Sequence, residues 1–305
     1  MKARGERGQR GAALIVTILL LGLITFLTAH MLYMSRQAIS LAESRVLGVR
    51  LRIAADSAQS AMIRLLIDDD DRLDHLGEAW AEKRTYPNGG TVLEVTVTDL
   101  NALFDPNALL LPDGSISSTR LAQLERLLRL NGCGTVNLEG LLDWLDTDDS
   151  PRSRGAESGY HATGGFGAKN AALDTLGELM LVRDGRTILD CSVDLLTVFS
   201  DRLININTAG ETVLMSLDDD FSAGLAHAVM QYRERTPFHD IVDLLEVPGM
   251  TADVYGKISR AVTVRSHYFA VEIHLRHGDL VMERRLVLRR RLEGVHILSW
   301  EQWER

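Results

Sequence analysis

The chain has 305 residues, enough for two or three domains, and its content of 46% hydrophobic and 25% charged residues is typical of a folded protein with a core. The formal net charge of −9 argues against nucleic acid as a partner, because phosphate binding favours a basic surface. The sequence contains no His-Glu-x-x-His, no Gly-x-Ser-x-Gly and no phosphate-binding glycine loop, so it does not indicate an enzyme.

The N-terminus combines a basic leader with a long apolar segment. Basic residues outweigh the single Glu6 among the first ten, which favours a cytoplasmic location for this end. From Gly11 to Ser35 the chain has no Asp, Glu, Lys or Arg, and this run is long enough to cross a hydrocarbon core of ~30 Å. A cleaved secretory signal has a shorter apolar core followed by a small-residue site, so a soluble secreted product is not favoured.

A helical pattern continues beyond Ser35. Apolar residues recur at spacings of three and four, as on one face of an α-helix, at Ile39, Ala42, Val46, Val49 and Ile53. No proline occurs before Pro87. We predict one helix over residues 12–67, with 12–34 in the membrane. Asp68 to Asp71 are expected to end it, since negative charge opposes the dipole at a helix C-terminus.

The remainder contains two β-rich regions separated by helical sequence. Residues 68–110 include an alternating strand at 91–98, and residues 261–305 include a predicted β-hairpin. Between them, residues 111–260 are predicted to form an all-α domain, in which Asn207 or Thr208 caps one helix. Arginines of the hairpin are expected to form a solvated face, with a partner-binding edge as the alternative; they are Arg284, Arg285 and Arg289 to Arg291.

Two features of the α domain are candidate sites. Cys133 and Cys191 form a disulfide if the body is exported, and are otherwise two unrelated buried thiols. Asp146, Asp148 and Glu157 have the spacing of positions one, three and twelve of an EF-hand loop, but Pro151 stands where that loop requires glycine. The segment is therefore a carboxylate cluster, either a solvated loop or a site for a hard cation.

Several segments resemble the K-type minor pseudopilins of type II secretion systems. Gly11 followed by Ala12 resembles a type IV prepilin cleavage site, and Val16 occupies the mature position where most pilins carry a glutamate that the K type lacks. Further similarity lies in "DLNALFDPNAL" at 99–109, in the acidic segment at 143–157 and in "ININTA" at 204–209. The resemblance covers residues 8 to about 300.

This resemblance implies an α+β fold in which a long N-terminal helix lies on a small antiparallel sheet, with a large all-α domain inserted between strands. It implies a leader over residues 1–11 that a prepilin peptidase removes, N-methylation of Ala12, and a single-pass inner-membrane protein with a periplasmic body. The expected function is non-enzymatic: a pseudopilus tip subunit that initiates assembly and aids export, with I- and J-type minor pseudopilins and other pseudopilins as partners. It also implies bound calcium, with Asp143, Asp146, Asp148, Asp149 and Glu157 as ligands.

Residues 204–250 offer an alternative function. They resemble the helix-hairpin-helix, or SAM-like, modules of DNA-binding proteins, so a membrane-anchored DNA-binding protein is the second hypothesis. Such modules bind phosphate through glycine-rich hairpins beside Lys or Arg. Here the first hairpin contains Asp218, Asp219 and Asp220, which would repel phosphate.

Overall fold

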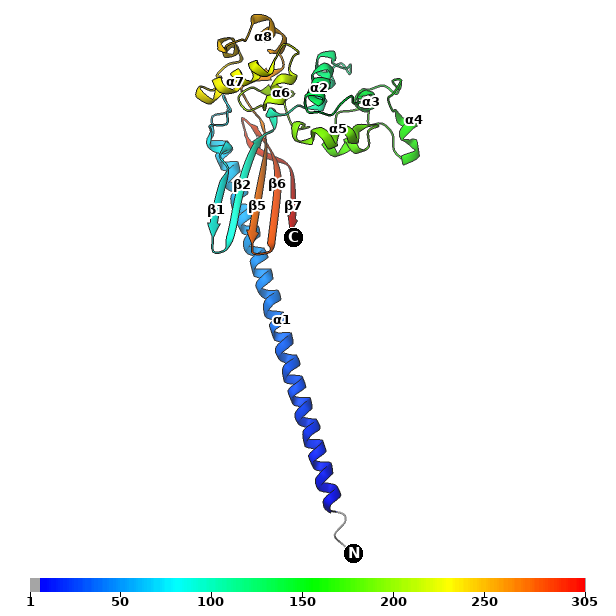
Figure 1. The fold of residues 1–305 in the computed structure, drawn as a ribbon, viewed down its shortest axis with the longest axis vertical. Helices are drawn as coiled ribbons and strands as arrows, with labels where there is room; N and C mark the ends of the chain where they lie inside the picture. The colour runs from blue at the N-terminus through cyan, green and yellow to red at the C-terminus, as the bar shows by residue number, and fades with distance from the viewer. Residues whose placement is uncertain (1–5, 305) are drawn as a thin grey trace. The chain divides into compact units, whose positions relative to one another are not determined.

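The computed structural model describes residues 6–304, and the chain forms two compact units, residues 1–57 and 58–305. The first unit is helical: α1 spans Glu6–Asp68 and continues into the second unit (Figure 1). Within Ala12–Asp68, α1 reaches a mean hydropathy of 2.6, so it is long and apolar enough to cross a membrane. The side chains from Ala12 to Arg45 are exposed, as expected for residues that face lipid or other helices.

The second unit contains a five-stranded antiparallel sheet. Its strand order is β1-β2-β5-β6-β7, and Figure 1 shows the strands side by side. The bounds are β1 Arg84–Asn88, β2 Thr91–Asp99, β5 Tyr268–His277, β6 Leu280–Arg291 and β7 Gly294–Glu304. Because β2 pairs directly with β5, the residues between these two strands form one insertion.

The regular structure of the insertion is almost entirely helical. Its α-helices are α2 Ser118–Leu130, α3 Glu139–Leu145, α4 Ser158–His161, α5 Gly185–Ser192, α6 Glu211–Ser216, α7 Ala223–Arg235 and α8 Ala252–Ile258. Leucines spaced along α2 and α3 are buried in a single apolar core with Phe221 and Phe238. The predicted fold class, a long helix and an antiparallel sheet with a helical insertion, is confirmed.

Buried polar groups tie the insertion to the sheet. Short strands β3, Ile204–Asn205, and β4, Val262–Thr263, pair in parallel. The Asn205 side-chain amide donates to the Asp99 carboxylate at 3.2 Å and to the Ser266 hydroxyl at 2.8 Å. The predicted all-α domain did not include this parallel pair, because strands of two residues are too short to show an alternating pattern in the sequence.

The predicted helix cap in this region is wrong. Gly210, not Asn207 or Thr208, is the N-cap residue of α6. Both predicted cap residues are buried and used elsewhere: Asn207 donates to the carbonyl of Phe238 at 2.9 Å, and the Thr208 hydroxyl donates to Asp99 at 2.5 Å. Tertiary hydrogen bonds have replaced the local cap.

The C-terminal β region is a three-stranded meander, because β7 extends over Gly294–Glu304. It differs from its prediction in its arginines. The arginines do not form one solvated face, since Arg284 and Arg290 are buried while Arg285 and Arg291 are exposed. Arg284 donates to Gln59, near the end of α1, at 3.0 Å and to Gln302 of β7. Strand alternation sends every second arginine inward.

Candidate functional site

The acidic loop begins at the end of α3. Leu141, Leu142 and Leu145 bury one face of this helix, and Asp143 is fully buried beside them. Gly155 passes so close to Asp143 that a Cβ atom on it would lie 1.9 Å from the carboxylate. The loop therefore closes back on the helix only with glycine at this position.

Three of the predicted ligands come together. Oxygen atoms of Asp146, Asp148 and Glu157 lie within 4.8 Å of one another. Asp146 and Glu157 are each only 4% exposed, whereas Asp148 is open to solvent. Neither oxygen of Glu157 and only one oxygen of Asp146 has a hydrogen-bond partner among the described residues. Burial, followed by the negative charge of Asp143 and Asp146, raises the pKa of Glu157 to about 7.

The other two predicted ligands lie outside this group. Asp143 is paired with Arg152, whose Nη1 lies 2.5 Å from the Asp143 carboxylate and 2.6 Å from Asp146. Asp149 is exposed and does not join the three carboxylates. Arg152 is the cation that neutralises Asp143, a role that the local sequence pattern did not indicate.

This donor set fits a hard divalent cation. Carboxylate oxygens are the ligands that calcium prefers, and buried oxygens without hydrogen-bond donors are costly unless a cation or proton neutralises them. A second acidic group, Asp69, Asp74 and Glu78, is different. Arg290 forms ion pairs with both aspartates there, and Glu78 accepts from the indole of Trp80 at 2.7 Å. Donors of the chain itself bond to the carboxylates of that group. Among the described residues, the structure therefore favours a cation site only in the loop at 146–157.

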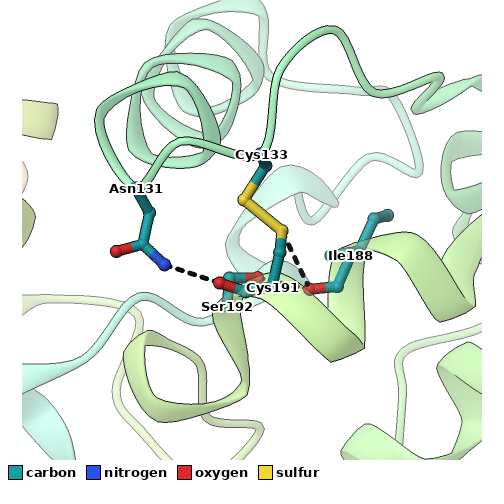
Figure 2. Close-up of a disulfide and its surroundings, with 5 residues drawn as sticks. All are labelled: Asn131, Cys133, Ile188, Cys191 and Ser192. Carbon is teal, nitrogen blue, oxygen red and sulfur yellow. Dashed lines mark hydrogen bonds between the residues drawn. A yellow bond between two sulfur atoms is a disulfide. The ribbon is translucent and has the colours of Figure 1, made fainter.

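A disulfide joins Cys133, just after α2, to Cys191 in α5, with their Cα atoms 5.8 Å apart. Figure 2 shows Asn131 donating its side-chain amide to the carbonyl of Cys191, at 2.5 Å. The segment between the two cysteines contains the whole acidic loop. The cross-link therefore closes the part of the chain that carries the carboxylates.

The predicted leader cleavage site lies between Gly11 and Ala12, where the backbone of α1 is helical. Residues 1–5 of the leader lie outside the described residues. The aspartates of the first hairpin in the 204–250 module contact cations of the chain itself. Asp219 accepts from Arg126 at 2.7 Å, and Asp220 accepts from Lys257 at 2.6 Å. This hairpin presents carboxylates, so its geometry gives no support to the DNA-binding alternative.

An apolar helix that continues into a small antiparallel sheet, with a helical domain inserted between β2 and β5, defines a pilin-like protein. Residues 99–187 and 204–265 each match a family model described as type II secretion system protein K. Type II secretion system protein K of Pseudomonas aeruginosa is 28% identical over 297 residues, which cover 90% of this chain and 86% of that protein. The protein of the same name from Pectobacterium carotovorum is 25% identical and covers 92% of both chains.

A solved structure with this fold is the GspK-GspI-GspJ complex of the type 2 secretion system of enterotoxigenic Escherichia coli. One of its chains matches with a TM-score of 0.68 and 21% identity, covering 87% of this chain and 99% of that chain. This chain therefore matches the protein K family of type II secretion systems over most of its length.

Proposed function

We propose that this protein is a non-enzymatic minor pseudopilin that occupies the tip of the type II secretion pseudopilus, initiates its assembly and aids protein export. The observation that carries the proposal is the architecture of a protein K relative: an apolar α1 joined to a small sheet, with a bulky helical insertion. Val16 supports the tip position, because a subunit without the usual glutamate lacks a partner for the N-terminal amine of a neighbour.

The proposed partners are the I- and J-type minor pseudopilins. The solved relative is described in a complex with GspI and GspJ, which supports the same assembly here. Side chains of α1 from Ala12 to Arg45 are exposed and largely apolar, so this stretch has the surface needed for helix packing in a filament. Purified full-length chain mixed with the I and J subunits of one system should elute as a single complex. Separate elution of all three would contradict the proposed assembly.

The proposed location is the inner membrane, with one span and a periplasmic body. The apolar part of α1 supports the span, and the disulfide supports a body in an oxidising compartment, where such bonds persist. The test is the mass of the N-terminal peptide of protein recovered from membranes. A start at N-methylated Ala12 supports processing by a prepilin peptidase. A start at Met1, in cells with an active peptidase, or beyond residue 30 would contradict it.

We also propose that the acidic loop binds calcium through Asp146, Asp148 and Glu157, with Asp143 holding Arg152 beside them. The unpartnered oxygens of Glu157 support this assignment. A bound ion would neutralise three clustered carboxylates and hold the loop against α3. Calcium should raise the unfolding temperature of the wild-type protein and of Asp253→Asn, which removes an exposed carboxylate outside the loop. Glu157→Gln should abolish the increase; an equal increase in Glu157→Gln would contradict the assignment.

A further inference from the structure

Three consecutive arginines end strand β6, and they do not share one environment. Arg290 points inward, is 4% exposed, and pairs with Asp69 and Asp74. Arg289 and Arg291 alternate with it and lie on the opposite face of the strand. With His267, Asp201 and the turn at 292–293, these arginines line a cavity of about 350 Å³. We call it the arginine notch.

The acidic groups of the notch already have partners. Asp201 lies 2.5 Å from Nδ1 of His267, and this hydrogen bond raises the pKa of His267. Glu293 lies 3.6 Å from Arg291 and 3.8 Å from His296. Both carboxylates of the notch are therefore engaged, and neither reaches Arg289 within ion-pair distance.

Arg289 is the arginine of the notch that forms no ion pair with a carboxylate of the described residues. Its guanidinium stacks over the ring of Tyr268, its cross-strand neighbour, with 5.0 Å from the guanidinium carbon to the ring centre. The side chain is half-buried, and its Nε has no acceptor. Within residues 6–304, no carboxylate forms an ion pair with it. A stacked, partly dehydrated guanidinium is held in one orientation, so it loses little freedom when it binds an anion.

We propose that the arginine notch binds an oxyanion, a phosphate or a carboxylate, with Arg289 as the anchoring residue. The planar guanidinium presents a fork of N–H donors that matches two oxygens of either group. The overall charge of −9 opposes non-specific binding of anions to the rest of the protein. Saturable binding of an anion would therefore report a specific site. This site does not depend on the function proposed above, on the acidic loop or on calcium.

The test is calorimetric titration of inorganic phosphate into the full-length chain in detergent, at neutral pH and constant ionic strength. Wild type should bind in the millimolar range or tighter and saturate. Arg289→Met keeps an unbranched apolar stem over Tyr268 and should weaken binding about tenfold or more, the loss expected for one charged hydrogen-bonded contact. The matched control is Arg285→Met, which removes an exposed arginine of the same strand paired with Glu272 at 3.7 Å. It should bind as wild type does.

A parallel titration with acetate distinguishes the two sources of the oxyanion. Binding of phosphate alone assigns a phosphate site, and binding of acetate assigns a carboxylate site such as an acidic side chain of a partner. If Arg289→Met does not fold, Arg289→Lys replaces it, since lysine keeps the charge but loses the fork and should bind several-fold more weakly. The proposal is overturned if wild type binds neither anion saturably, or if the folded Arg289 variant binds as wild type does.

Discussion

Two groups of buried carboxylates in the body of this protein are built in opposite ways. At the end of the sheet, Asp99 accepts hydrogen bonds from Ser266, Thr208, Asn205 and the amide of Asn101, and Asp74 is paired with Arg290. In the acidic loop, Glu157 has no hydrogen-bond donor for either oxygen, although it is only 4% exposed. Burial raises the pKa of Asp99 and of Glu157 alike, so burial alone does not distinguish the groups.

What distinguishes them is whether the chain supplies the donors. A buried acid with several donors stabilises one arrangement of the backbone, whereas a buried acid without donors is satisfied only by a ligand or a proton. The sheet-end group therefore joins the helical insertion to the sheet, and the loop group is the candidate for an ion. Five predictions test this difference, from the largest expected effect to the smallest.

Arg290→Met should cost about 3–5 kcal/mol of unfolding free energy, because it leaves the buried Asp74 and the half-buried Asp69 without their cation. The measurement is urea unfolding followed by circular dichroism. Arg285→Met is the control, since its guanidinium is exposed and should contribute less than about 0.5 kcal/mol. Equal midpoints for the two variants would show that the sheet-end group does not depend on Arg290.

Replacing both cysteines with serine, Cys133→Ser with Cys191→Ser, should lower the unfolding free energy by about 2–5 kcal/mol. The disulfide closes a segment with a sequence separation of 58 that includes the acidic loop, so its loss frees the unfolded chain. Calcium titrations of this variant should also show weaker binding. A variant with unchanged stability would mean that the tertiary contacts of α2 and α5 hold the loop without the cross-link.

Asp99→Asn should destabilise the protein by about 1–3 kcal/mol. The substitution replaces one acceptor oxygen of the carboxylate with an NH2 group, which would face the hydroxyl and amide donors that now bond to Asp99. The same unfolding measurement applies. Asp113→Asn, an exposed aspartate bonded only to the following turn, is the control. Stability equal to wild type would show that Asp99 does not hold the insertion to the sheet.

Glu157→Gln should act in the opposite direction in calcium-free buffer and stabilise the protein by about 1 kcal/mol, because it removes one of several like charges. Asp99→Asn and Glu157→Gln form a matched pair, since each replaces a buried acid with its amide. Destabilisation by both would remove the distinction between the two groups.

The smallest effect concerns pH and the pair of His267 with Asp201. The hydrogen bond to Asp201 raises the pKa of His267, so the stabilisation is complete below the ordinary value of 6.5 and is lost as pH rises through the folded value. Wild type should lose stability relative to Asp201→Asn as the pH rises above 6.5, by less than about 1 kcal/mol for this partly exposed pair. Parallel pH profiles would contradict the pairing.

Much of the architecture follows from local pattern. The apolar run from Gly11 to Ser35 and the spacing after it predicted α1, and alternation in the two β-rich regions predicted the strands that pair as β2 and β5. Asp105 accepts from the backbone amide of Asn107 at 2.8 Å in a local turn, whereas the Asn107 side chain donates to the distant carbonyl of Leu173 at 3.0 Å. The clustering of Asp146, Asp148 and Glu157 also followed from their spacing in one loop.

By itself, the sequence determined the membrane-length helix, the order of β-rich and helical regions, and the loop that gathers three carboxylates. Only the tertiary structure decided which charged groups are neutralised. Arg290 meets Asp74 across 216 residues, and Thr208 meets Asp99 across 109, so neither partner is visible in a local window. Whether a buried charge is neutralised depends on contacts between distant segments, whereas helices, strands and turns depend on neighbouring residues. The two kinds of buried acid therefore look alike in the sequence.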